Sequence, residues 1–179
     1  MARQQSNHLK FAVYQSQARK SALTIFREQL AGIEENALDP LSIKFDVIDS
    51  NALEAFYRWE GEVSHFPWED ITEWKVKDFK GFDLSIWYDQ QLCGLCYATP
   101  RDSKITIKIV LLEGNPDKTH PLKGYIAALA LSAVDAYART IKCVSIEIQD
   151  PEPKVVPWYE KLGFVLDEAN RLVISVQPA

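Results

Sequence analysis

Hydrophobic and polar residues change their spacing between Ile105 and Ala138, and this change predicts a strand, a loop and a helix. The first apolar residues recur at every second position, and the later ones occupy both faces, which is typical of a buried central strand: Ile105, Ile107, Ile109, Val110, Leu111 and Leu112. A run of turn-forming residues follows, EGNPDKTHP. Apolar residues then recur at helical spacing: Leu122, Ile126, Leu129, Ala133, Ala136 and Tyr137. We expect the rest of the chain to be organised around this unit.

The start of the predicted helix is a candidate anion site. A helix that begins beside the carboxyl end of a buried strand directs unpaired N–H groups and a partial positive charge into a crevice, which suits a phosphate or pyrophosphate. Gly124, in the expected first helical turn, would let the backbone approach such a ligand closely, and Lys123 would add a charge. The alternative is that Gly124 only eases the packing of the helix.

The same patterns predict the remaining elements. Helices are expected at residues 9–35, 51–62 and 153–162, with a shorter one ending near Lys77. Strands are expected at residues 41–48, 82–88, 91–99, 143–149, 164–167 and 172–177. This order of elements predicts a mixed α/β sheet with helices packed on its faces.

The first predicted helix has an apolar stripe that needs a surface to pack on: Tyr14, Ala18, Ala22, Ile25, Phe26, Leu30 and Ile33. We expect it to pack on its own domain, with a partner subunit in a homodimer as the alternative. The chain is therefore divided into an amphipathic helical extension over residues 1–39 and an α/β domain over residues 40–179. On this division, removal of residues 1–35 should leave a folded core.

Composition and charge narrow the class of protein. The 179 residues, 47% of them hydrophobic, are enough for one domain with a core. The longest apolar run reaches about half of the roughly 20 residues that a membrane span needs, and the N-terminus has no apolar signal segment, so we expect a cytoplasmic protein without a membrane partner. The net charge is −5, and residues 1–30 carry five basic residues against one acidic residue, Glu28. The acidic remainder argues against a nucleic-acid partner and is compatible with a cationic acceptor.

Cysteines and aromatic residues raise two further questions. Cys93 and Cys96 form a C-x-x-C pair, but in a strand this spacing sends their side chains to opposite faces, so we expect no metal site. Phe66, Trp68 and Trp74 are close enough in sequence to wall a binding site. In a domain of this size such aromatic residues more often belong to the core, and we favour that interpretation.

Residues 158–164 read WYEKLGF, which resembles the C-terminal motif L-Y-x-x-x-G-F of the GNAT superfamily of N-acetyltransferases. The expected order of elements from Leu41 to Gln177, about three quarters of the chain, is similar to that fold. The resemblance implies a mixed, mostly antiparallel sheet that is splayed at its centre and has helices on both faces. The N-terminal helix lies outside it.

The resemblance also implies acetyl-CoA as cosubstrate and a place for it. Pantetheine would pair with the backbone of the central strand, in the manner of an added β-strand, at Val110, Leu111 and Leu112. The pyrophosphate would lie on the N–H groups of Lys123, Gly124 and Tyr125.

The loop before the predicted helix departs from the family pattern Q/R-x-x-G-x-G/A. With Gly124 in register, Pro121 replaces the polar residue and brings no N–H, while Ile126 replaces a small residue. The loop is also longer than usual. These departures favour an alternative function, that of a catalytically degenerate GNAT-fold binding or regulatory module.

Transfer of an acyl group to an amine needs a base for the amine and an acid for the departing thiolate. The resemblance places Tyr159 at the tyrosine that acts as this acid in many members, and a core aromatic is its alternative. Glu147 matches the glutamate of an L-E-V pattern, and partial burial between two isoleucines would make it a usable base. Asp150 and Glu113 are rivals, and a solvated carboxylate is the alternative for each.

The sequence therefore predicts an acyl-CoA-dependent N-acetyltransferase that acts on a primary amine of a small molecule or a peptide. Retention of Tyr159 and Glu147 favours this function over the degenerate module and over a structural protein assembled through its N-terminal helix. The acceptor is not specified, because one such core serves many acceptors with different loops.

Overall fold

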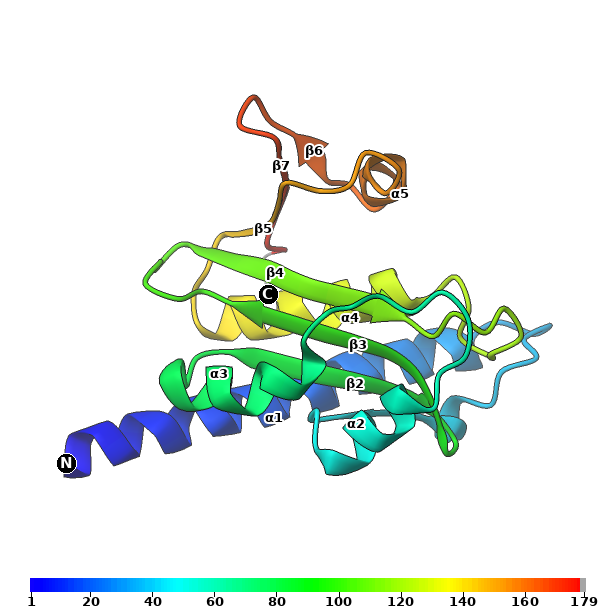
Figure 1. Ribbon diagram of the computed structural model, residues 1–179, viewed down its shortest axis with the longest axis horizontal. Coiled ribbons are helices and arrows are strands. Elements are labelled where there is room, and N and C mark those ends of the chain that lie inside the picture. The colour runs from blue at the N-terminus through cyan, green and yellow to red at the C-terminus, as the bar shows by residue number, and fades with distance from the viewer. Residues whose placement is uncertain (178–179) are drawn as a thin grey trace.

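A seven-stranded sheet organises the computed structural model, in which residues 1–177 are described (Figure 1). The strand order is β1-β2-β3-β4-β5-β7-β6, and every neighbouring pair is antiparallel except β4 and β5. The strands are β1 Ile43–Asp46, β2 Phe82–Tyr88, β3 Gln91–Thr99, β4 Thr106–Gly114, β5 Ser145–Gln149, β6 Val165–Leu166 and β7 Arg171–Ser175. The predicted mixed, mostly antiparallel sheet is confirmed.

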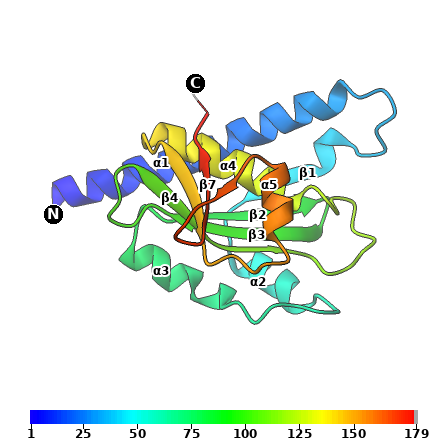
Figure 2. The ribbon, with the colours of Figure 1, turned by 90° about the horizontal axis from the view of Figure 1, so that it is seen from above.

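Helices cover both faces of this sheet and divide the core in two (Figures 1 and 2). Helices α1 (Ala2–Ala31) and α4 (Ile126–Thr140) pack together over one face, which we call the α4 face. The other face, called the α3 face, is covered by α2 (Ser50–Tyr57), the 3-10 turn η2 (Trp68–Asp70) and α3 (Ile71–Lys77). A 3-10 turn, η1 (Pro40–Ser42), precedes β1, and α5 (Val156–Lys161) follows β5. Within residues 1–177 no helix has both the length and the apolar character needed to cross a bilayer.

The sheet opens between β4 and β5. These parallel strands pair only from Thr106 with Ser145 to Lys108 with Glu147, although β4 continues to Gly114. Beyond this short ladder, β5, α5, β6 and β7 stand away from the plane of β2–β4 (Figure 1). The splayed centre implied by the sequence is therefore present, and it leaves one edge of β4 without a strand partner.

The strand, loop and helix between Ile105 and Ala138 match their prediction except at the start of the helix. All six apolar residues predicted for its stripe are buried, but α4 begins at Ile126 and residues 121–125 form turns before it. Gly124 lies outside the helix with φ +87, a conformation that residues with a Cβ rarely adopt. Its glycine is explained by this backbone conformation and not by helix packing.

Helix α1 packs on α4 and β1 of its own molecule. It is 30 residues long and runs from Ala2 to Ala31, so that both its start and its end lie earlier in the chain than the predicted range of 9–35. Two residues of the predicted stripe, Ile25 and Ile33, are exposed, whereas the polar residues Gln15 and Arg19 are buried. The division at residue 39 stays a prediction, and the final two residues of the range 40–179 lie outside the described part.

The prediction that the side chains of Cys93 and Cys96 point to opposite faces of the sheet is wrong, because both belong to the core on the α4 face. Ile86 pairs with Gly94 and Trp87 pairs with Leu92, so Cys93 is the extra residue of a β-bulge. The bulge shifts the alternation of side chains by one position. Cys93, Cys96 and Cys143 are buried free thiols.

Candidate active site

The free edge of β4 is the centre of the candidate site. Tyr97 of β3 pairs with Leu111 and Ala98 pairs with Ile109, so Val110 is the extra residue of a second bulge and has no partner in β3. The Val110 side chain is 37% exposed. On the β5 side, the backbone of Val110, Leu111 and Leu112 lies beyond the last parallel pair. This edge can therefore pair with an extended ligand, and the pairing of pantetheine that the resemblance implied for these three residues stays a prediction.

Helix α5 carries Tyr159, whose ring packs against the core on the α4 face. The short helix ends at Gly163, whose φ of +104 turns the chain back to Phe164, and the Phe164 N–H donates to the Tyr159 carbonyl at 3.1 Å. The two rings meet edge to face with centroids 5.5 Å apart. The Tyr159 side chain packs against the core that contains Cys96.

Burial, with a smaller contribution from Cys96, raises the pKa of Tyr159 above its ordinary value. Its hydroxyl makes no hydrogen bond within the described residues. The phenol therefore keeps its proton at neutral pH and has it available for another acceptor.

Glu147 reaches the opening from the opposite face. It is 6% exposed and follows Ile146 of the α4-face core, so the alternation of β5 directs it to the α3 face. One carboxylate oxygen lies 3.7 Å from the Lys108 ammonium and accepts from the Gln149 amide at 3.2 Å, and the other lies 3.7 Å from the Arg171 guanidinium. Glu147 thus links β4, β5 and β7 where the splay begins.

The two rival carboxylates have different surroundings. Glu113 accepts from the Ser64 N–H at 2.7 Å, the Ser64 hydroxyl at 2.5 Å and the Trp68 indole N–H at 2.7 Å. These three donors tie the segment before η2 to β4, and this network gives Glu113 a structural role. Asp150 is exposed just after β5 and accepts from the Asn170 amide at 3.4 Å.

The loop before α4 supplies fewer free donors than the sequence predicted. The Lys123 N–H donates to the His120 carbonyl at 3.2 Å and the Tyr125 N–H to the Leu122 carbonyl at 3.0 Å. Gly124 is the one residue of the predicted three whose N–H makes no such bond within residues 1–177. Apart from its two chain neighbours, no atom of the described residues lies within 4 Å of the position that a Cβ of residue 124 would take. The first N–H groups of α4, at residues 126–128, also lack helical partners.

His120 in this loop was not singled out from the sequence, where it lies among turn formers. It is 5% exposed, and its Nδ1 atom has no hydrogen-bond partner within the described residues. Burial lowers its pKa, so the imidazole is neutral at pH 7. Its neighbours in the chain gave no periodic signal that would have indicated burial.

A cavity of about 360 Å³ opens on the α3 face beside Val110. Trp74 and Tyr97 form its aromatic wall, with their ring centroids 5.5 Å apart, and Thr99 and Asp78 also line it. Of the three aromatic residues considered from the sequence, Trp74 lines this cavity, Trp68 is fully buried in the core and Phe66 is exposed. A larger cavity of about 660 Å³ lies between the end of α2 and the turn from β2 to β3. Tyr159 and Glu147 line neither of these two cavities, and the smaller one is the one that borders the free edge of β4 at Val110.

The splayed sheet and the helix after β4 give this chain the fold of solved GNAT N-acetyltransferases. Ard1 from Thermoplasma volcanium superposes with a TM-score of 0.59 and 14% identity over 76% of this chain and 99% of that chain. The ribosomal-protein-S18-alanine N-acetyltransferase from Escherichia coli superposes with a TM-score of 0.56 and 11% identity, over 76% of this chain and 96% of that chain. N-acetylglutamate synthase from Neisseria gonorrhoeae, complexed with coenzyme A and N-acetyl-glutamate, superposes with a TM-score of 0.54 and 11% identity. The match covers 76% of this chain and 35% of that chain.

Sequence comparison adds no relative, since no protein-family model and no curated protein matches the chain. At the identities of the structural neighbours, the likeness establishes the fold alone.

Proposed function

We propose that this protein is an N-acetyltransferase that moves an acetyl group from acetyl-CoA to a primary amine. The observation that carries the proposal is the free edge of β4 where the sheet opens. Tyr159 packs on the α4 face and Glu147 lies on the opposite face of β5, and we propose that both act on a ligand held at this edge. The fold is shared with N-acetyltransferases, one of them complexed with coenzyme A.

The residues present fit acetyl-CoA. The backbone of Val110, Leu111 and Leu112 would hold the pantetheine, and the Gly124 N–H with the first turn of α4 would hold the pyrophosphate. Lys123 and Tyr125 are exposed beside Gly124, where a lysine charge and an aromatic ring would add to this contact. The bound cosubstrate supplies the activated acyl group as a thioester.

Tyr159 is the proposed general acid. As the amine nitrogen forms its bond to the acyl carbon and the carbon–sulfur bond breaks, the phenol O–H donates its proton to the departing sulfur, and solvent then restores that proton. The raised pKa of Tyr159 keeps the proton on the phenol in the resting enzyme and also makes it a weaker acid, so the role requires that the proton move as negative charge develops on the sulfur.

Glu147 is the proposed base, acting on the amine directly or through a water molecule. It lies on the same face as the cavity beside Val110, and we propose this cavity as the place of the acceptor amine. The proton released from the attacking nitrogen would pass to the carboxylate and then to solvent.

The second candidate function is a GNAT-fold module that binds without turnover. Pro121 and Ile126 in the loop favour it, as does the use of the Lys123 and Tyr125 N–H groups within turns. The two functions are separated by measuring release of free thiol from acetyl-CoA with a panel of amines that includes a polyamine, an amino acid and a peptide with a free N-terminus. An acetyltransferase releases thiol with at least one acceptor, and Tyr159→Phe suppresses that release; a module binds acetyl-CoA and releases none.

A further inference from the structure

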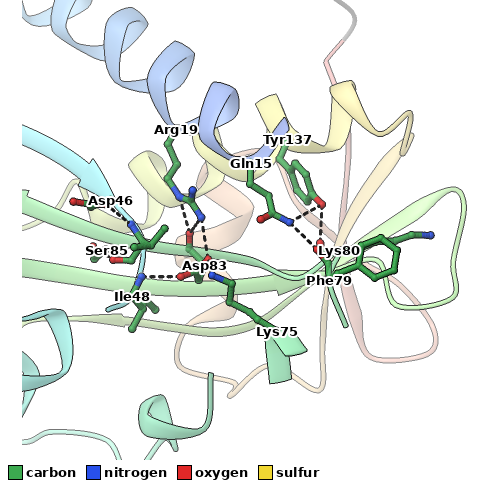
Figure 3. Close-up of polar contacts among 11 residues, drawn as sticks. Gln15, Arg19, Asp46, Ile48, Lys75, Phe79, Lys80, Asp83, Ser85 and Tyr137 are labelled. Atoms are coloured by element: carbon green, nitrogen blue, oxygen red, sulfur yellow. Dashed lines mark hydrogen bonds and ion pairs between the residues drawn. The ribbon is translucent and has the colours of Figure 1, made fainter. Parts of the chain in front are cut away.

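We propose that helix α1 positions α3 across the edge of the sheet through the buried Asp83, and so fixes the wall of the cavity beside Val110 (Figure 3). The expected effect of this link on binding of the acceptor amine rests on the proposed function. The mechanical link between the two helices does not, and it is tested separately below.

The short first strand leaves room for this link. β1 pairs with β2 only from Ser85 to Tyr88, so Asp83 has no β1 residue beside it. Arg19 of α1 fills this place: its Nε and Nη2 atoms donate to the Asp83 carbonyl at 2.9 and 2.7 Å, and Nη2 also lies 2.9 Å from the Asp83 Oδ1 atom. The guanidinium thus binds both the backbone and the carboxylate of one residue.

A second cation meets the same carboxylate from the opposite layer. Lys75 of α3 places its Nζ atom 2.8 Å from Asp83 Oδ1, and the Ile48 N–H donates to Oδ2 at 2.7 Å. Asp83 is fully buried and Arg19 is 8% exposed. One carboxylate therefore joins a helix on the α4 face to a helix on the α3 face, as Figure 3 shows.

Helix α1 also holds the segment that follows α3. Gln15 donates from its side-chain amide to the Phe79 carbonyl at 3.0 Å, and the rings of His8 and Phe11 contact the Phe79 ring with centroids 4.3 and 5.4 Å away. Both the middle of α3, at Lys75, and the chain just after its end are therefore attached to α1.

Apart from Lys75, helix α3 is held by the Trp74 ring, which packs on Tyr97, and at its end by Asp78, which accepts from the Thr99 hydroxyl. It has seven residues, and Ile71 is the one that is buried. Trp74 and Asp78, which flank Lys75, line the cavity beside Val110. Arg19 fixes the carbonyl and the Oδ1 atom of Asp83, and Lys75 binds that same Oδ1 atom. Without Arg19 the buried carboxylate that anchors α3 can change its position, and without Lys75 α3 loses this anchor altogether.

The test is hydrogen exchange, followed by mass spectrometry, of the full chain with Arg19→Met. The matched control is Arg27→Met on the same helix, because Arg27 binds the carbonyls of Pro40 and Ile43 and not Asp83. Arg19→Met should speed exchange in the α3 peptide on the order of tenfold relative to β3, the internal reference for global opening. Arg27→Met should leave the α3 peptide unchanged relative to β3.

Lys75→Met provides a second variant if Arg19→Met does not fold, since Lys75 is partly exposed. It should speed exchange in α3 and also in the part of α1 around Arg19. Unchanged α3 exchange in Arg19→Met, or unchanged α1 exchange in Lys75→Met where the first variant does not fold, would overturn the proposal.

Where an acceptor is known, Arg19→Met should raise the acceptor KM more than it lowers kcat, with binding of acetyl-CoA unchanged. Arg19→Lys should restore part of that KM, because it returns a charge to Asp83. A purely structural residue would lower stability without this split. Failure of the proposed function would appear as absent acetyl-CoA binding, or as binding without release of thiol, and either result leaves the exchange test intact.

Discussion

At the scale of single residues, Tyr159 and Glu147 lie on opposite faces of one opening, and each has a bystander alternative. Tyr159 has an unpaired hydroxyl and a raised pKa, whereas both oxygens of Glu147 already have cationic or amide partners. Their proposed roles therefore make different demands, since the phenol only has to donate, while the carboxylate has to exchange an existing partner for an amine or a water.

Tyr159→Phe removes the hydroxyl and preserves the ring that packs on Phe164. Loss of general acid catalysis should lower the turnover rate by about 10²–10⁴-fold, with binding of acetyl-CoA retained. Steady-state kinetics with a responsive amine measure the first effect and calorimetric titration measures the second. Near wild-type turnover across the pH range would remove the acid role.

Glu147→Gln separates the base role from a structural one. If Glu147 is the base, the rate falls and the acidic limb of the pH–rate profile disappears, while the free energy of unfolding changes little. If it serves only to join β4, β5 and β7 through Lys108 and Arg171, the substitution lowers stability and leaves that limb in place. Paired pH–rate profiles and urea unfolding decide between these outcomes.

Prediction of single residues from the sequence was possible where the signal was local, and the role of Tyr159 stays a prediction. Tyr159 lies in a contiguous motif, so seven neighbouring residues were enough to single it out. Arg19 and Asp83 gave no such signal, because their contact spans 64 positions and depends on where β1 ends. His120 was missed for the same reason, since its burial follows from tertiary packing and not from the turn residues around it.

At the scale of elements, strand β3 carries three buried titratable groups. Burial raises the pKa of Cys93 to about 11 and those of Cys96 and Tyr97 to about 12. In the unfolded chain these groups titrate at ordinary values of about 8.5 for cysteine and 10 for tyrosine. The unfolded state therefore loses protons at a lower pH than the folded state.

The free energy of unfolding should thus be insensitive to these groups below about pH 8 and should fall as the pH rises from about 8.5 to 12. Denaturant titrations at a series of pH values measure this slope. Cys96→Ala removes one of the three groups and should make the slope shallower. An unchanged slope in this variant would show that the Cys96 thiol does not contribute.

Elements were predicted well in number and order and less well at their ends. The helix stripe from Leu122 to Tyr137 was confirmed as buried, but turns replace its first residues because Gly124 adopts a positive φ that no helix contains. The bulges at Cys93 and Val110 were not predicted, since a bulge adds one residue without altering the composition of a strand. The second bulge matters most, because it exposes Val110 at the centre of the site.

At the scale of the whole molecule, helix α1 contributes more to the core than the sequence predicted. The sequence favoured a dispensable extension, whereas in the structure Ala18, Ala22 and Leu30 belong to the core and Arg19 neutralises Asp83. We therefore expect a chain without residues 1–35 to lose cooperative unfolding. Circular dichroism during thermal denaturation tests this, and a sharp transition in the truncated chain would restore the original division.

A milder version of the same test is Arg19→Met. Leaving Asp83 without one of its cations should lower the free energy of unfolding by about 3 kcal/mol, within the range for broken buried ion pairs. Lys20→Met, one position along the same helix and exposed, should change it by less than about 0.5 kcal/mol. If the two substitutions lower the free energy of unfolding equally in urea, the contact between Arg19 and Asp83 does not contribute more to stability than an exposed residue does.

The central claim, that the free edge of β4 and the start of α4 hold acetyl-CoA, is tested most directly by thermal unfolding with and without this compound. At about 100 times its dissociation constant, a ligand that binds the folded state alone adds about 2.7 kcal/mol, which for a chain of this size raises Tm by several degrees. Gly124→Ala should weaken the effect, because its methyl group would strain a positive φ and project at the proposed pyrophosphate contact. A Tm that acetyl-CoA, longer acyl-CoA esters and free CoA all leave unchanged at saturating concentration would contradict the account.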